Sequence, residues 1–415
     1  MIKKILFSGS VPYLIVDLIN KSIPFLLLPF LTHYLSPASF GIVSNFSVAI
    51  VIFQIIIGLS VNGSIMANYY HYDEEKFREF SSSAIFLITL LTAALVALIL
   101  GVSMFANFEK WGYSTYILVM AAICSYWTIV FSTCVSLYRV KRKLTHFIVL
   151  QLLTTIANYG LTLYFLIAMK MDYNGRILGI ALSTILSGIL SISFMVKAGI
   201  ITTSINKVHF IEARKFGLPL IPHQLSKWVR NGYDKLILTF LFGLTVNGIY
   251  SFYLQIATVL YLLVESINVA YQPSFFNRLK NTPMNYKTHV KNNLLLLGAL
   301  LAIAVVMFLG FYFVGPLLFN AKYFQSTIVL LFILFAMAFR GVNLFTTNAF
   351  FFYKETKSLA KTSIIASVIH LIFSFAMAKF FGIYGTCVAL LVVEVFICFN
   401  NIYMLKDLKQ IENVA

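Results

Sequence analysis

Ionisable side chains lie inside long apolar stretches of this 415-residue sequence. Placing such a side chain in an apolar environment costs free energy, so these residues are candidates for a function. The stretch at 216–242 is the densest, with His223, Lys227, Arg230 and Asp234 spaced i, i+4, i+7 and i+11. This spacing places all four on one face of a helix. Three potentially positive groups accompany one acid, so the pattern predicts a cationic strip that can bind an anion. The alternative is a self-neutralising ladder built on the Arg230–Asp234 pair.

Further cations lie in other apolar stretches. Lys21 falls in the first stretch, four residues after Asp17, and Arg340 falls in the tenth. We predict that an anionic substrate is bound by Lys21, Lys227, Arg230 and Arg340. For Arg340, pairing with Glu265 or Glu394 is the alternative.

The acids in these stretches are expected either to form structural ion pairs or to carry a coupling ion, because burial shifts the ionisation of a carboxyl group. They are Asp17, Asp234, Glu265 and Glu394. His370 stands alone in an apolar stretch and is expected to pack as a core histidine, with a proton relay as the alternative.

No catalytic residue, cofactor or metal site is predicted. The four cysteines, Cys124, Cys134, Cys387 and Cys398, all fall in apolar stretches and lack metal-ligand spacing. Neither a phosphate-binding loop nor a paired-histidine zinc motif occurs. ATP-driven transport by this chain alone is therefore not expected.

The elements that must position these charges are membrane helices. The sequence is 60% hydrophobic and 11% charged, with a mean hydropathy of +0.89, which excludes an ordinary soluble enzyme. It predicts an all-α polytopic membrane protein, because a spanning helix needs about 20 apolar residues. We count about twelve stretches, at 11–35, 38–66, 83–106, 114–138, 147–169, 175–199, 216–242, 246–275, 292–319, 323–352, 361–380 and 383–405.

The net charge of +17 reflects loop composition. With cytoplasmic N and C termini, 21 of the 31 Lys and Arg residues fall in inside loops and five in outside loops. That bias follows the positive-inside rule and supports this orientation. Nucleic acid is accordingly not an expected partner; the lipid bilayer is.

A shift of 207 residues reveals a sparse internal repeat. It places Pro12 on Pro219 and Gly41 on Gly248, and two six-helix halves would then share one orientation. We therefore divide the chain into an N-terminal half at 1–206 and a C-terminal half at 207–415, two pseudo-symmetric six-helix bundles.

The segment Pro29-Phe-Leu-Thr-His-Tyr-Leu-Ser-Pro-Ala-Ser-Phe-Gly41 resembles the first outer loop of the lipid-linked O-antigen flippases, the Wzx group. These belong to the polysaccharide transporters of the multidrug/oligosaccharidyl-lipid/polysaccharide (MOP) exporter superfamily. The run Tyr138-Arg-Val-Lys-Arg-Lys143 is similar to that family's cationic inner loop.

The resemblance implies a MATE-like fold and a transporter, not an enzyme. The implied substrate is an undecaprenyl-pyrophosphate-linked oligosaccharide, the O-antigen repeat unit of lipopolysaccharide biosynthesis. It would cross the bacterial inner membrane from the cytoplasmic to the periplasmic leaflet by alternating access, with polysaccharide polymerase and chain-length proteins as further partners.

Alternatives of the same fold are a flippase for another polysaccharide or the peptidoglycan lipid precursor, and a multidrug or cation exporter. A net-positive cavity argues against cationic substrates. From other classes, a major-facilitator carrier and a membrane-embedded glycosyltransferase or polysaccharide polymerase remain open. The short loops argue against a polymerase, which would need a large outer loop.

Overall fold

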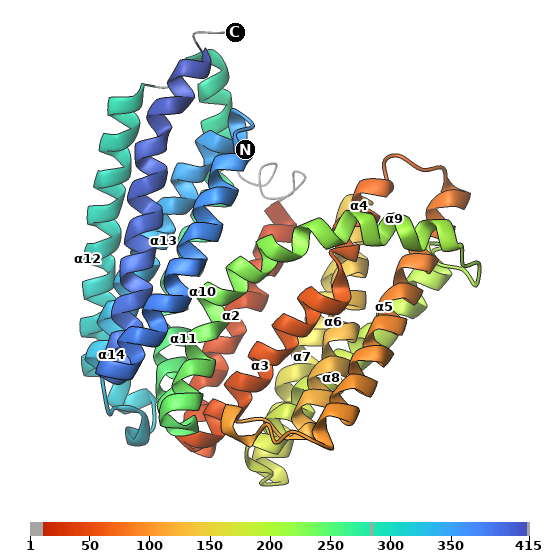
Figure 1. Cartoon of the computed structure of the whole chain (residues 1–415), viewed down its shortest axis with the longest axis horizontal. Helices are drawn as coiled ribbons and strands as arrows, with labels where there is room; N and C mark the ends of the chain where they lie inside the picture. Colours follow the sequence, from red (N-terminus) through yellow and green to blue (C-terminus); the bar gives the residue numbers. More distant parts are fainter. Residues whose placement is uncertain (1–10, 283–284, 413–415) are drawn as a thin grey trace. The chain divides into compact units, whose positions relative to one another are not determined.

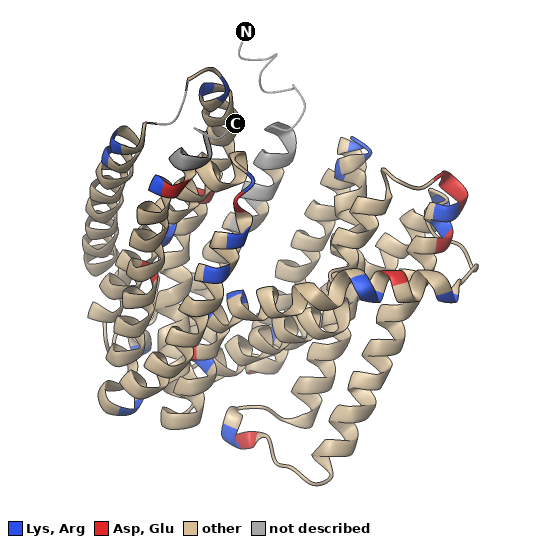
Figure 2. Ribbon diagram, turned by 45° about the horizontal axis from the view of Figure 1, so that its top comes forward, with Lys and Arg blue, Asp and Glu red and all other residues tan. Residues whose placement is uncertain are grey.

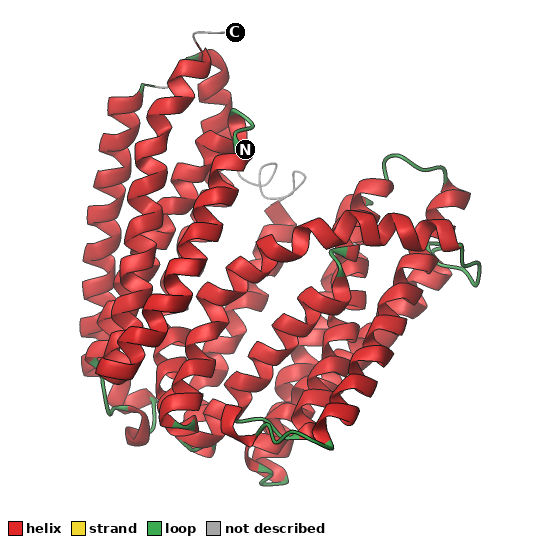
Figure 3. Ribbon diagram, viewed as in Figure 1, coloured by secondary structure: helices red, strands yellow, loops and turns green. Residues whose placement is uncertain are grey.

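The computed structural model describes residues 11–282 and 285–412, and every regular element within these ranges is a helix (Figures 1 and 3). The all-helical fold class predicted from composition is confirmed. The chain divides into two compact units, and each is described separately. The first contains the described residues up to Leu27 and then Ile42–Trp228; the second contains Leu28–Gly41 and the chain from Val229 onward.

The first unit is built from helices packed around a buried apolar core. Phe46, Phe80 and Phe147 are fully buried members of that core. Its elements are α2 (Val11–Tyr34, up to Leu27), α3 (Pro37–Gly58, from Ile42), α4 (Val61–Asn68), α5 (Glu74–Ser103), η1 (Glu109–Trp111), α6 (Thr115–Val140), α7 (Leu144–Leu163), the π-helical η2 (Tyr164–Ala168), α8 (Asp172–Lys197), α9 (Lys207–Gly217), η3 (Leu218–Leu220) and the first part of α10 (Ile221–Phe242).

The second unit has an aromatic core at one end. Tyr323 is fully buried, its ring centroid lies 4.9 Å from that of Phe252, and its hydroxyl donates to the carbonyl of Leu35. Besides the remaining parts of α2, α3 and α10, this unit contains α11 (Leu244–Asn281), α12 (Tyr286–Leu318), η4 (Ala321–Tyr323), α13 (Ile328–Phe352) and α14 (Thr356–Glu412).

Helix α14 is a hairpin of two helical segments joined at Gly382. This residue has φ 59° and ψ −138°, outside the helical region and accessible mainly to glycine. Asn400 donates to the Thr362 hydroxyl at 2.9 Å, and Ala366 shares an apolar cluster with Val393 and Ile397. In these contacts, residues farther before Gly382 meet residues farther after it, so the two segments are antiparallel.

Helices α3 and α11 cross within the second unit at two glycines that the 207-residue shift aligns. A Cβ on Gly41 would lie 2.2 Å from the carbonyl oxygen of Leu244, and one on Gly248 would lie 1.8 Å from that of Pro37. The same shift relates Pro37 to Leu244. The contact is therefore reciprocal, and it requires glycine on both helices.

Some helix boundaries differ from the predicted ones. The stretch predicted at 38–66 is interrupted, because Leu59 and Ser60 have positive φ angles and separate α3 from α4. Helix α5 begins nine residues before the predicted start, since the Asp73 carboxylate caps it by accepting from the Lys76 amide at 2.9 Å. The inside loop near 200–215 contains a helix, α9, that the periodicity did not predict.

Nine described helices are long and apolar enough to cross a membrane. Helix α10, which contains His223, Lys227, Arg230, Asp234 and Lys235, is not among them, and the two segments of α14 count as one. Lys, Arg, Asp and Glu lie mostly near helix ends, and few lie halfway along a helix (Figure 2). The chain is thus a multi-pass membrane protein, while the number of twelve crossings and the cytoplasmic termini stay predictions.

Candidate functional site

The strongest polar contact inside the second unit joins α13 to the second segment of α14. Arg340 lies halfway along α13, and its Nη2 and Nε donate to Glu394 Oε1 at 2.6 and 3.0 Å. The Glu394 side chain is only 1% exposed. Of the two roles predicted for Arg340, the structure shows pairing with Glu394.

A second arginine approaches the same carboxylate from α10. Arg230 Nη1 lies 3.9 Å from Glu394 Oε1, and its Nη2 donates to the Ser363 hydroxyl at 3.0 Å. Arg340 also donates to the Asn231 side-chain oxygen at 2.8 Å. Two guanidinium groups therefore share one carboxylate, and the group of three has a surplus positive charge.

Asp234 forms a separate buried cluster one helical turn beyond Arg230. It accepts hydrogen bonds from the Tyr250 hydroxyl at 3.0 Å and the Ser374 hydroxyl at 2.6 Å. Nε2 of His370, which is fully buried, lies 2.9 Å from the Asp234 carboxylate. The Arg230–Asp234 ladder considered for this helix is therefore wrong, because each residue has other partners.

His370 is a fully buried core histidine, as the sequence predicts, and it also contacts Asp234. Neither ring nitrogen of His370 meets hydrogen-bond geometry, so the contact is a close approach of Nε2 to the Asp234 carboxylate inside the core. The pair unites α10 with the first segment of α14. Sequence reasoning missed it because the two residues are 136 positions apart.

The remaining predicted residues lie elsewhere. Glu265 is half-buried on α11, one turn after Tyr261, whose ring centroid lies 5.9 Å from the Arg340 guanidinium carbon. Lys227 is exposed and belongs to the first unit, so the structure does not place it with Arg230. The side chains of Asp17 and Lys21 lie outside the described residues.

Arg176, a half-buried cation of the first unit, lies at the boundary between a predicted outside loop and the stretch predicted at 175–199. Arg176 lies in the second turn of α8 and donates at 2.7 Å to both Asn158 and Thr162 of α7. Its guanidinium has no carboxylate within 4.0 Å among the described residues. The arginine is thus held by uncharged acceptors, and these hydrogen bonds join α7 to α8.

The chemistry available in the second unit is charge recognition. Two arginines with one shared acid can bind an anionic group, and guanidinium groups suit the oxygens of a phosphate. No group of His, Cys, Asp and Glu able to hold a metal ion occurs in the part of the chain that the structure describes.

The fold and this buried charge define a class of protein: a helical, multi-pass membrane protein with the architecture of transporters and flippases. A multidrug resistance MATE family transporter of the MOP superfamily, inward-facing, matches 94% of this chain and 96% of its own with a TM-score of 0.73 at 12% identity. The lipid II flippase MurJ, in an inward closed conformation, matches 97% of this chain and 87% of its own with a TM-score of 0.71 at 17% identity.

The chain belongs to the polysaccharide biosynthesis protein family, whose sequence profile matches residues 6–279. Two relatives from Haemophilus influenzae are an uncharacterized membrane protein, 25% identical over 384 residues, and Lsg locus putative protein 1, 24% identical over 381 residues. In both comparisons the match covers 88% of this chain and 89% of the relative.

Proposed function

We propose that the protein is a flippase that moves an undecaprenyl-pyrophosphate-linked oligosaccharide, an O-antigen repeat unit, from the cytoplasmic to the periplasmic leaflet of a bacterial inner membrane. The observation that carries the proposal is the surplus positive charge of Arg230, Arg340 and Glu394. A pyrophosphate is the anionic group of such a substrate. Membership of a polysaccharide biosynthesis family supports a sugar-bearing cargo.

In this mechanism the two arginines exchange partners. Without substrate they share Glu394, which lowers the cost of their positive charge in an apolar bundle. A pyrophosphate that reaches Arg230 supplies additional acceptors, and Lys227 and Lys21 are proposed to complete its binding. The lipid tail stays in the bilayer, while alternating access of the halves 1–206 and 207–415 carries the head group across.

Asp234, Glu394, Glu265 and Asp17 are proposed as structural or coupling acids. Of these, Asp234 and Glu394 have the contacts on which such roles depend, because each is buried and each contacts a residue from another helical segment. Polysaccharide polymerase and chain-length proteins are proposed partners that would use the translocated product.

The test is transport by the purified full-length chain in proteoliposomes. The substrate is a fluorescent undecaprenyl-pyrophosphate oligosaccharide, and a membrane-impermeant quencher reports the leaflet in which it lies. The wild-type chain should equilibrate the probe between leaflets. Arg230→Ala should abolish transport, whereas Arg230→Lys should retain part of it if positive charge matters more than bidentate geometry.

The matched control is Lys322→Ala, which removes an exposed cation from a short helix at one end of the second unit. It should transport at the wild-type rate. In cells, Arg230→Ala should abolish surface polysaccharide while the protein stays in the membrane. Normal polysaccharide with normal protein abundance would overturn the role of Arg230.

A flippase for the peptidoglycan lipid precursor is the second candidate, favoured by the likeness to MurJ, which extends over 97% of this chain. The two candidates differ in sugar and share the pyrophosphate. Parallel assays with lipid II and with the O-antigen precursor decide between them, and transport of lipid II alone would replace the first proposal.

A further inference from the structure

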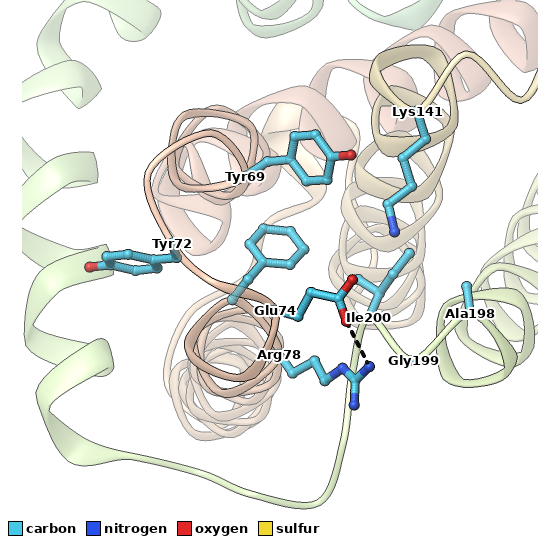
Figure 4. Close-up of a pocket in the computed structure, with 9 residues that line it drawn as sticks. Tyr69, Tyr72, Glu74, Arg78, Lys141, Ala198, Gly199 and Ile200 are labelled. Carbon is cyan, nitrogen blue, oxygen red and sulfur yellow. Dashed lines mark hydrogen bonds and ion pairs between the residues drawn. The ribbon is translucent and has the colours of Figure 1, made fainter.

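A cavity of about 230 Å³ lies at one end of the first unit (Figure 4). It is formed where the chain enters α5 and where it leaves α6 and α8. Its lining residues are Tyr69, Tyr72, Glu74, Phe77, Arg78, Lys141, Ala198, Gly199 and Ile200. Three of them are charged, and two of those three are cations.

Lys141 is the most informative lining residue. It caps the C-terminus of α6, and its side chain extends into the cavity toward Glu74 and Ile200 (Figure 4). No carboxylate among the described residues lies within 4.0 Å of its ammonium group. Its nearest favourable contact is with the Tyr69 ring, whose centroid is 5.8 Å from Nζ.

The other two charges partly cancel. The Arg78 guanidinium lies 3.5 Å from the Glu74 carboxylate in an i,i+4 pair, a weak arrangement because both groups are largely exposed. The pKa of Lys141 is lowered, first by burial and then by the nearby Lys143, while Glu74 offsets the effect only in part. The cavity therefore holds a lysine charge that Glu74 neutralises only in part.

Helix α9 indicates which environment the cavity faces. The buried side of α9 contains His209, whose ring lies 3.8 Å from the Glu79 carboxylate of α5, so α9 is held beside the cavity's own helix. The opposite side exposes Val208 and Ile211, and the same short helix contains Lys207 and Arg214. Exposed apolar and cationic side chains on one helix are typical of the lipid head-group region.

We infer that this cavity is a phosphate-binding site at the membrane surface, in which Lys141 and Arg78 bind a phosphate group and Tyr69 borders it. The phosphate could belong to an anionic phospholipid or to a polyprenyl pyrophosphate, because the recognised chemistry is the same. The site is distinct from Arg230 and Arg340 and does not depend on the flippase assignment.

The experiment measures binding to the full-length chain in nanodiscs of zwitterionic phosphatidylcholine. Inorganic pyrophosphate is titrated by calorimetry, and phosphatidylglycerol doped into the discs is the competing probe. Lys141→Gln should weaken pyrophosphate binding about tenfold, the loss of one charge-assisted hydrogen bond. Glu74→Gln should strengthen binding, because it removes the competing carboxylate from the same cavity.

Lys141→Arg and Lys110→Gln are the controls. Lys141→Arg keeps the charge and should bind within a few-fold of wild type, which separates loss of binding from loss of folding. Lys110→Gln removes a lysine at the opposite end of the unit and should change nothing.

Competition between phosphatidylglycerol and inorganic pyrophosphate identifies the source of the phosphate. Displacement of pyrophosphate by phosphatidylglycerol in the wild-type chain, but not in Lys141→Gln, identifies a phospholipid site; binding without displacement identifies a pyrophosphate site. Equal affinity in wild type, Lys141→Gln and Glu74→Gln would overturn the proposal, as would weaker binding in Glu74→Gln.

Discussion

At the scale of single residues, Glu394 is the group on which the second unit depends most. It is buried and is the shared partner of Arg230 and Arg340. Glu394→Ala should lower the free energy of unfolding by about 3–5 kcal/mol, because it leaves two buried like charges without an acid. Chemical denaturation followed by intrinsic fluorescence measures this loss.

Replacing Arg230, Arg340 and Glu394 together by apolar residues separates their contribution to stability from their role in transport. The triple variant Arg230→Met, Arg340→Met and Glu394→Leu should recover most of the stability lost in Glu394→Ala, since well-packed apolar residues can replace a buried ion pair. It should still fail to transport the pyrophosphate-linked probe. A triple variant that transports normally would show that these charges are only structural.

The His370–Asp234 contact gives a second prediction at this scale. A double-mutant cycle with His370→Leu and Asp234→Asn should show a coupling energy of about 1–3 kcal/mol, because the two side chains share one buried polar contact. Unfolding of the two single variants and the double variant measures it. A coupling energy near zero would return His370 to the role of an independent packed side chain.

The sequence predicted the charged members of the site and, as one alternative, the pairing of Arg340 with Glu394, but not the partners of Arg230 and Asp234. Arg230, Asp234, Arg340 and Glu394 stand out because an ionisable residue in an apolar stretch is costly. Which residues meet depends on how helices far apart in the sequence pack, and spacing along one helix contains no such information. The sequence did not identify the hydrogen-bonding partners Ser363, Ser374 and Tyr250, because uncharged polar residues are common in membrane helices.

At the scale of elements, the crossing of α3 and α11 depends on two glycines. Gly248→Ala should lower the melting temperature of the purified chain, because the new methyl group would overlap the Pro37 carbonyl and force the helices apart. Gly298→Ala is the matched control on α12, where a Cβ would meet no atom within 4 Å. It should leave stability unchanged or raise it by about 0.5–1 kcal/mol.

Helices α6 and α13 both end with a basic residue in the left-handed region, Arg142 at φ 55° and Lys354 at φ 60°. Each follows the hydrogen-bonding pattern of a Schellman motif, in which glycine is preferred. Arg142→Gly and Lys354→Gly should therefore each raise the free energy of unfolding by about 1 kcal/mol.

Alanine variants at the same positions test whether the gain in stability comes from the backbone conformation or from removal of the charge. Arg142→Ala removes the charge and keeps the steric cost of the left-handed conformation, so it should give no comparable gain. Thermal unfolding of Arg142→Gly, Lys354→Gly, Arg142→Ala and Lys354→Ala in one detergent makes the comparison. Equal gains from glycine and alanine would assign the effect to charge.

At the scale of the whole molecule, loop charge predicts which ends of the helices are cytoplasmic. In a background lacking the four buried cysteines, Lys141→Cys should react only with a membrane-permeant thiol reagent in intact cells. Lys322→Cys should also react with an impermeant reagent added from outside. Labelling of both cysteines by the impermeant reagent would contradict the predicted orientation.

Composition was enough to predict an all-helical membrane protein, because 60% apolar residues with short connections leave no other class. The turn at Gly382 was also predictable, because a glycine falls in the short gap between the stretches predicted at 361–380 and 383–405. The break at Leu59 and Ser60 was not, because neither residue type favours a positive φ angle. Helix α9 was missed because its buried face, built around His209 and Ala213, is short and mixed in polarity.

The pairing of Arg340 with Glu394 also has a consequence for how the chain is made. The two residues are 54 positions apart, and at about 5–20 residues per second the ribosome needs about 3–11 s to reach Glu394 after Arg340. During that interval α13 enters the membrane with an arginine at its midpoint that lacks its carboxylate. An 18-residue window of α13 has a mean hydropathy of 2.3, which offsets the cost of inserting that charge. Insertion of α13 before Glu394 is available thus requires a more apolar helix than the folded protein needs, in which Arg340 is paired.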